Sequence, residues 1–117
     1  MKSDAFDSDG ASTTNGEIES TTMFAALAHE RRQYALHYLA QKPGAVPLGD
    51  IAEYIAVREG DPSRDRYERV LTGLYHLHLP HLLDANLVAY DTEQKTVTLL
   101  AGREFLSPYL ELIAADA

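Results

Sequence analysis

The fold of this chain is decided by residues 67–88, which read YERVLTGLYHLHLPHLLDANLV. Apolar residues recur there at spacings of three and four, as on one side of an α-helix, so this side is expected to be buried. The expected buried stripe consists of Tyr67, Val70, Leu71, Leu74, Leu77 and His78. The pattern predicts one long amphipathic helix over residues 64–85.

The opposite side of this helix carries polar residues at the same helical spacing. Arg69, Thr72 and His76 are three and four positions apart, and Gly73 beside them would let a partner come close to the backbone. We expect this side to be free to contact another molecule. Pro80 cannot donate a backbone hydrogen bond to His76, so the helix is expected to kink there or to restart with Pro80 as its first residue.

A β-hairpin is expected directly after the helix. Asn86 tolerates the left-handed backbone conformation that often ends a helix. Residues 87–90 and 96–100 alternate between apolar and polar positions on either side of the polar residues 91–95, as two strands with one wet face do. A helix followed by a hairpin is the order of a winged helix.

Two helices are expected before this stretch and one after it. Residues 21–41 have a helical stripe that ends at Lys42-Pro43-Gly44, and residues 48–58 have another that begins after Pro47. Ser63 can cap the long helix that follows. The last stripe, over residues 105–113, is expected to pack on the first helix of its own chain or of a second chain. It consists of Phe105, Leu106, Tyr109, Leu110, Leu112 and Ile113.

Length and composition limit the class of protein. The 117 residues suffice for one core, and no apolar run long enough to span a bilayer occurs. No signal pattern and no cysteine are present, so we expect a cytoplasmic protein without disulfides or a Cys-ligated zinc. Residues 1–20 are too poor in apolar groups to fold and are expected to form a flexible acidic tail, followed by one domain over residues 21–117.

The formal net charge is −8, with 10 Lys plus Arg against 18 Asp plus Glu. Such a balance normally counts against nucleic-acid binding, because phosphate contacts need basic side chains. The acids are scattered along the chain, and a protein adapted to high salt would show this bias on every surface. We therefore interpret the charge as an adaptation to high salt.

Three stretches carry a family resemblance, together with Tyr90-Asp91: residues 27–36 (LAHERRQYAL), residues 48–52 (LGDIA) and residues 74–88 (LYHLHLPHLLDANLV). They resemble the winged helix-turn-helix domains of archaeal and bacterial regulators, the ArsR-like group among them, and in particular haloarchaeal winged-helix domains of unknown function. The resemblance covers residues 21–112. It implies a mainly α-helical fold with a small β-hairpin: a three-helix core, a two-stranded wing and a C-terminal helix. It also implies a DNA-binding regulator that is usually dimeric.

In winged helices the third helix enters the major groove and the wing lies along the DNA backbone. On this chain Arg69, Thr72 and His76 would face base edges, with Gly73 beside them, and the cations nearest the phosphates would be Arg64, Arg66 and Lys95. The alternative is that these arginines form salt bridges with Asp65 and Glu68 on a solvated helix face. Those two acids would repel phosphate.

Arg31, Arg32 and the histidines are further candidate site residues. Arg31 falls within an apolar stripe, so its stem is expected to pack while its guanidinium reaches a carboxylate or carbonyl; the alternative is a phosphate contact from Arg31 or Arg32. A metal site of His76, His78 and His81, completed by His29 or His37, does not follow a known zinc pattern, and His78 is more often a hydrogen-bonded core residue there. We expect no metal, no cofactor and no enzyme, since no catalytic motif occurs.

Two functions follow from these patterns. The first is a homodimeric DNA-binding transcription regulator that reads double-stranded DNA with the helix at residues 64–85 and dimerises through its first and C-terminal helices. The second is a winged-helix protein-interaction module, whose acidic surface docks a basic or DNA-bound partner. A small-ligand or metal sensor on the same fold is a third, weaker alternative.

Overall fold

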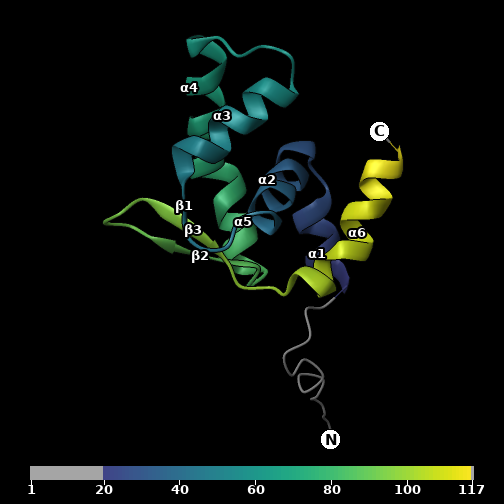
Figure 1. The fold of residues 1–117 in the computed structure, drawn as a ribbon. Helices are drawn as coiled ribbons and strands as arrows, with labels where there is room; N and C mark the ends of the chain where they lie inside the picture. Colours follow the sequence, from purple (N-terminus) through teal and green to yellow (C-terminus); the bar gives the residue numbers. More distant parts are fainter. Residues whose placement is uncertain (1–19, 117) are drawn as a thin grey trace, which may run out of the picture.

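The computed structural model describes residues 20–116, and the expected acidic tail therefore lies outside the described residues except for Ser20. The chain is mainly helical, with a small three-stranded antiparallel sheet. Figure 1 shows α3 and α4 at the top of the molecule, the β2–β3 hairpin projecting to the left, and α1 and α6 on the right. Of the described helices, none combines the length and apolar character needed to cross a membrane.

The first expected helix, residues 21–41, is wrong as a single helix. It is divided into α1 (Ser20–Leu27) and α2 (Glu30–Ala40), and His29 between them is extended at φ −123° and ψ 134°. The ring of His29 caps α2, because its Nδ1 accepts a hydrogen bond from the Arg31 backbone N–H. At the end of α1, Arg32 and Gln33 donate to the last carbonyls, which satisfies groups that a continuous helix would have used itself.

The sheet has one strand more than the two-stranded wing that the sequence predicts. Strand β1 (Val46–Pro47) pairs with β3 (Thr96–Leu99), which also pairs with β2 (Val88–Asp91), so the strand order is β1-β3-β2. A two-residue strand has no alternation to reveal it in the sequence, and only its partner on β3 defines it. The Leu48 N–H donates to the Lys95 carbonyl and so joins the start of α3 to the hairpin turn.

Helix α3 (Leu48–Arg58) begins and ends close to the predicted positions, and α4 (Arg64–Gly73) begins where the long helix is predicted to begin. Gly60, at φ 84°, turns the chain between them, and Ser63 caps α4 by accepting a hydrogen bond from the Arg66 backbone N–H. The two helices pack against each other, and α3 also packs against α2. The expected Ser63 cap is confirmed.

The long predicted helix continues without a break but changes its winding. After α4 comes a π-helical turn, η2 (Leu74–His78), and then α5 (Leu79–Asp84). The Leu79 N–H donates to the Leu74 carbonyl, five residues back, and the wider turn directly precedes Pro80, which has no N–H to donate. The extra residue rotates the following side chains: His78 is buried, whereas Leu77 is 49% exposed and was wrongly assigned to the buried stripe.

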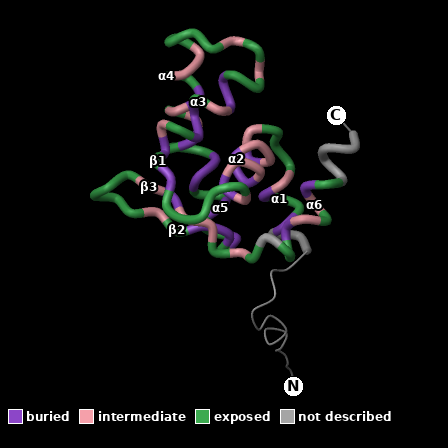
Figure 2. Tube along the Cα trace, viewed as in Figure 1, coloured by how far each residue is buried: buried purple, intermediate pink, exposed green. Residues whose placement is uncertain are grey.

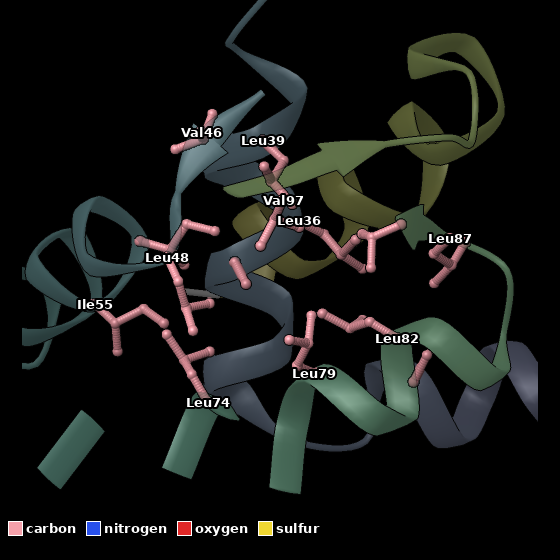
Figure 3. Close-up of a cluster of buried hydrophobic side chains, with 14 of the residues drawn as sticks. Leu36, Leu39, Val46, Leu48, Ile55, Leu74, Leu79, Leu82, Leu87 and Val97 are labelled. Atoms are coloured by element: carbon pink, nitrogen blue, oxygen red, sulfur yellow. The ribbon is translucent and has the colours of Figure 1, made fainter. Parts of the chain in front are cut away.

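The core lies between α2, α3, η2, α5 and the sheet (Figure 3). Figure 2 shows exposed residues along the hairpin turn and the α3–α4 connection, with buried ones concentrated where the elements face each other. Helix α6 (Arg103–Asp116) contacts α2 of its own chain, and its Leu106 and Leu110 are buried. Leu112 and Ile113 of the predicted stripe lie outside the side chains that the structure describes.

Candidate nucleic-acid interface

One side of α4 and η2 is open to solvent, as the sequence predicts. Arg69, Thr72 and His76 are all exposed, and 69% of the Arg69 side chain is accessible. The Thr72 hydroxyl donates to the Glu68 carbonyl at 2.9 Å, which leaves the lone pairs of its oxygen able to accept. The described residues of the chain therefore leave this side, which we call the outer face of α4, uncovered.

Gly73 does not belong to the outer face. A Cβ built on it would lie 3.7 Å from Arg31 Nη1 and 3.9 Å from His78 Cδ2, which are ordinary contact distances. The glycine therefore faces α2 of its own chain. The expectation that a partner approaches the backbone at Gly73 is not supported by this position.

The arginines of the outer face are paired with neighbouring acids. Arg64 Nε lies 3.1 Å from a Glu68 carboxylate oxygen, and Arg69 Nη2 lies 2.8 Å from one of Asp65. All four side chains are at least 60% exposed, and ion pairs of this kind contribute about 0–1 kcal/mol. The salt bridges that form the alternative to DNA contacts are thus present. They hold the guanidinium groups of Arg64 and Arg69 only weakly.

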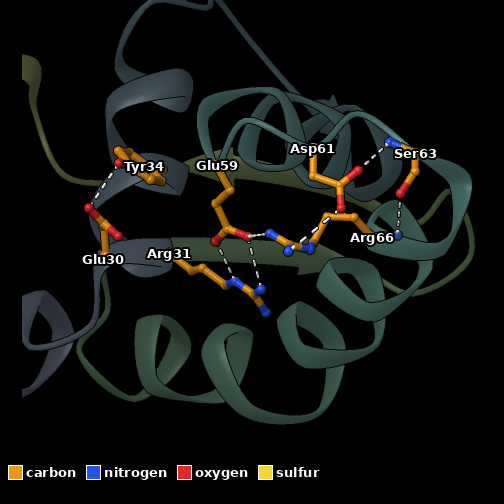
Figure 4. Close-up of polar contacts among 7 residues, drawn as sticks. All are labelled: Glu30, Arg31, Tyr34, Glu59, Asp61, Ser63 and Arg66. Carbon is orange, nitrogen blue, oxygen red and sulfur yellow. Dashed lines mark hydrogen bonds and ion pairs between the residues drawn. The ribbon is translucent and has the colours of Figure 1, made fainter.

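Arg66 differs from Arg64 and Arg69 because it is held on the inner side of α4 (Figure 4). Its Nη1 donates to Glu59 at 2.9 Å, and its Nη2 lies 3.6 Å from Asp61. Arg31 donates to both oxygens of the same Glu59 carboxylate, at 2.7 and 3.0 Å. The expectation that the Arg31 guanidinium reaches a carboxylate is confirmed.

Glu59 thereby connects three helices, since it receives Arg31 of α2 and Arg66 of α4 at the end of α3. The hydrogen bonds from Arg31 are the main reason why the pKa of the Glu59 carboxyl lies below its usual value, and Arg66 lowers it further. Only 15% of the Glu59 side chain is exposed, so the pairs are shielded from solvent. This arrangement fixes the angle at which α4 leaves the body of the domain.

A second polar group is buried beneath η2. Arg32 is 7% exposed and donates to the carbonyls of Ala25 and Ala26, while its Nη1 lies 3.2 Å from Nδ1 of His78. The ring of His29 lies against that of His78 with a centroid distance of 4.4 Å. His78 is therefore the hydrogen-bonded core residue that the sequence suggests, and the position of Arg32 removes it from contact with an external phosphate.

By sequence, the histidines of this region are candidate metal ligands. Across the described part of the chain, residues 20–116, no group of three or more His, Cys, Asp or Glu side chains is arranged to hold a metal ion. His76 and His81 are exposed, whereas His78 is buried among Arg32 and His29. The three histidines thus point into different surroundings.

A groove of about 460 Å³ lies between α4–η2 and the sheet, and sequence reasoning missed it as a site. Tyr67, Leu71 and Tyr75 form one wall, and their spacing of four places them along one ridge of the helix. Tyr90 of β2 lies opposite, with its ring centroid 6.3 Å from that of Tyr75. The rest of the lining comes from the start of α3 and the hairpin turn: Pro47, Leu48, Gly49, Thr92, Gln94 and Lys95.

A second hollow, of about 500 Å³, lies on the other side of Tyr67, between α3 and α4. It is lined by Asp50 and Glu53 of α3, by the half-exposed Val57, and by Arg64 of α4. The acidic hollow and the groove therefore have opposite electrostatic character, although they share the Tyr67 ring as a wall.

Comparison with known proteins gives one match. Residues 24–98 match the model of a family described as a domain of unknown function (DUF7344). No curated protein and no solved structure matches the chain. The matched range runs from α1 into β3 and includes the outer face of α4, the groove and the hairpin turn, but not α6.

Proposed function

The chain belongs to the DUF7344 family, and from that premise we propose that it is a winged helix-turn-helix DNA-binding transcription regulator and not an enzyme. In this proposal α3 and α4 are the helix-turn-helix, α4–η2 is the reading helix, and the β2–β3 hairpin is the wing. The element order and the pairing of β1 with β3 support the assignment. Fold alone does not determine function, so the proposal depends on the surface of α4.

The observation that carries it is the exposure of Arg69, Thr72 and His76 on the outer face of α4, in a chain whose β2–β3 hairpin also projects from the body (Figure 1). A helix needs such a polar, uncovered side to enter the major groove, where arginine can bind guanine through two hydrogen bonds. The exposed ion pairs of these arginines are weak. Arg69 can therefore leave Asp65 to contact a base edge, and Arg64 can leave Glu68 to contact a phosphate. Arg66, bound by Glu59, positions the helix instead.

We further propose that the regulator is a homodimer that pairs through α1 and α6. Phe24 on α1 is 65% exposed, Phe105 at the start of α6 is 42% exposed, and Leu100, between β3 and α6, is 58% exposed. Large exposed apolar side chains mark contact surfaces, and α1 and α6 lie on the side of the molecule away from the hairpin turn (Figure 1). A twofold dimer would present two reading helices to DNA.

The test is the affinity for genomic DNA fragments, measured at several salt concentrations against random competitor DNA. We expect selective binding that Arg69→Ala weakens by about 1–3 kcal/mol. Arg58→Ala is the matched control, because Arg58 is exposed on α3 and stacks on Tyr34 and Tyr54. Binding no tighter than to the competitor would remove the proposal.

A second candidate function, a protein-interaction module, is favoured by the hollow that contains Asp50 and Glu53. Its two acids and the exposed Val57 suit a basic side chain with an apolar stem, such as a lysine of a partner protein. Recovery of a stoichiometric protein partner from nuclease-treated extract, and its loss with Glu53→Lys, would support this function.

A further inference from the structure

We propose that the groove between α4–η2 and the β2–β3 turn holds a DNA sugar-phosphate strand, and that most of its phosphate contacts come from neutral hydroxyl groups. The inference rests on the proposed function and extends it to uncharged side chains outside the outer face of α4. The side chains concerned are Tyr67, Tyr75, Tyr90, Thr92 and Gln94, with Lys95 as the cation.

The charge of the groove is the first argument. The whole chain carries 18 acidic residues against 10 Lys plus Arg, yet no acid is among the described residues that line the groove, and Lys95 is among them. Of the acids at the turn, Asp91 directs its carboxylate to the backbone N–H groups of Glu93 and Gln94, and the exposed Glu93 is not among the lining residues. In an acidic protein, a hollow free of acids with one cation suits an anionic occupant.

The available donors are the second argument. Within residues 20–116, no side-chain partner is found for the hydroxyls of Tyr67, Tyr75 and Tyr90, and Tyr75 is 50% exposed. Tyrosine hydroxyls donate hydrogen bonds to phosphate oxygens without adding charge, and such contacts are common at DNA backbones. These three tyrosines line the same protein groove, between the proposed reading helix and the proposed wing. A DNA strand would pass there on its way from the major groove to the next groove of the DNA.

The backbone at Lys95 is the third argument. Lys95 has φ 58°, a left-handed conformation that a side chain with a Cβ adopts at a cost of about 1–2 kcal/mol. Glycine would avoid this cost, yet a strained lysine stands at this position in the lining of the groove. The strain is consistent with a requirement for a positive charge at that point.

The few cations predict a shallow dependence of DNA affinity on salt. If Arg64 and Lys95 are the phosphate-neutralising groups of a protomer, the slope of log K against log salt is about −1.8 per protomer. Neutral contacts release no counterions, so they add affinity without making this slope steeper. A DNA-binding protein that works in concentrated salt would benefit from having few charged phosphate contacts and several neutral ones.

The experiment measures this slope on one selected duplex for the wild type and two variants. Lys95→Gln is expected to reduce the steepness by about 0.9 per protomer. The triple change Tyr67→Phe, Tyr75→Phe, Tyr90→Phe is expected to weaken binding roughly tenfold or more at every salt concentration, with an unchanged slope. Tyr38→Phe on α2 is the matched control, and thermal unfolding checks that each variant folds.

The outcomes separate this inference from the proposed function. Wild-type affinity no better than for random DNA removes both. Selective binding that the triple change leaves intact, or a wild-type slope of about −6 or steeper per protomer, overturns the inference alone. An oligoproline peptide, which tyrosine-lined grooves can accept, is the rival probe: if it binds in the groove while the tyrosine changes spare DNA binding, the groove is a peptide site.

Discussion

Arg32 and His78 meet inside the domain, with Nη1 of the guanidinium 3.2 Å from Nδ1 of the imidazole and side chains that are almost fully buried. A guanidinium has no acceptor, so Nδ1 must be the unprotonated nitrogen and His78 must be neutral. Burial, and then the charges of His29 and Arg32, lower the pKa of His78 to about 4. The core beneath η2 therefore depends on an uncharged histidine.

The first prediction is a loss of stability in mild acid. The unfolded chain protonates His78 near pH 6.5 and the folded chain only near pH 4. The neutral ring thus makes its full contribution to the free energy of unfolding above pH 6.5. This contribution declines as the pH falls towards 4 and is constant below. The total loss is about 3 kcal/mol, measurable by urea unfolding at a series of pH values. His78→Gln should flatten that dependence, whereas the exposed His81→Gln should leave it unchanged.

The second prediction concerns the contact between Gly49 and Tyr67. A Cβ at position 49 would lie 2.8 Å from the Tyr67 hydroxyl, so Gly49→Ala must displace the ring, and overpacking of this kind typically costs about 1–3 kcal/mol. In a Tyr67→Phe background the clash is absent, and the same change should instead stabilise α3 by up to about 1 kcal/mol. Chemical unfolding of the four proteins gives the coupling energy. Additive effects would contradict the assigned contact.

The third prediction compares two carboxylates of similar chemistry. Glu59→Gln should destabilise the domain by about 1–3 kcal/mol, because Arg31 and Arg66 lose a shielded partner. Glu68→Gln should change the unfolding free energy by less than about 1 kcal/mol, because its pair with Arg64 is exposed. Equal losses for the two variants would show that Glu59 does not tie the helices together.

The fourth prediction tests the π-helical turn. Leu74→Ala should cost about 2–5 kcal/mol, since Leu74 is 1% exposed, whereas Leu77→Ala should cost much less, since Leu77 is 49% exposed. A regular α-helix would bury both residues on the same side. Comparable losses measured by thermal unfolding would therefore argue against the turn.

The fifth prediction tests the proposed dimer. Phe24→Ser combined with Phe105→Ser should shift the molar mass seen by light scattering from dimer to monomer, because both rings are exposed on the isolated chain. Val57→Ser, which removes a similarly exposed apolar group on α3, is the control and should leave the mass unchanged. A wild-type protein that is monomeric at high concentration would refute the dimer.

Some features could be predicted because they depend on neighbours in the sequence. The stripe of Val70 and Leu74, the Ser63 cap and the left-handed Asn86, with φ 58°, all follow from local spacing and residue type. The same local logic failed at Leu77, because helical periodicity assumes a constant number of residues per turn.

By itself, the sequence determined that α3 and α4 are amphipathic helices joined by a short turn and that a hairpin follows. It also determined that Arg69, Thr72 and His76 lie on an exposed side of the helix. Each of these properties depends on the spacing of a few neighbouring residues. Only the tertiary structure decided that the first helix breaks at His29, that β1 joins the sheet, and that Arg66 is held by Glu59 while Arg64 and Arg69 are exposed. It also placed Tyr67 and Tyr75 next to the hairpin turn, where they line one groove. Those features depend on partners distant in sequence, whose meeting follows from the packing of the whole core.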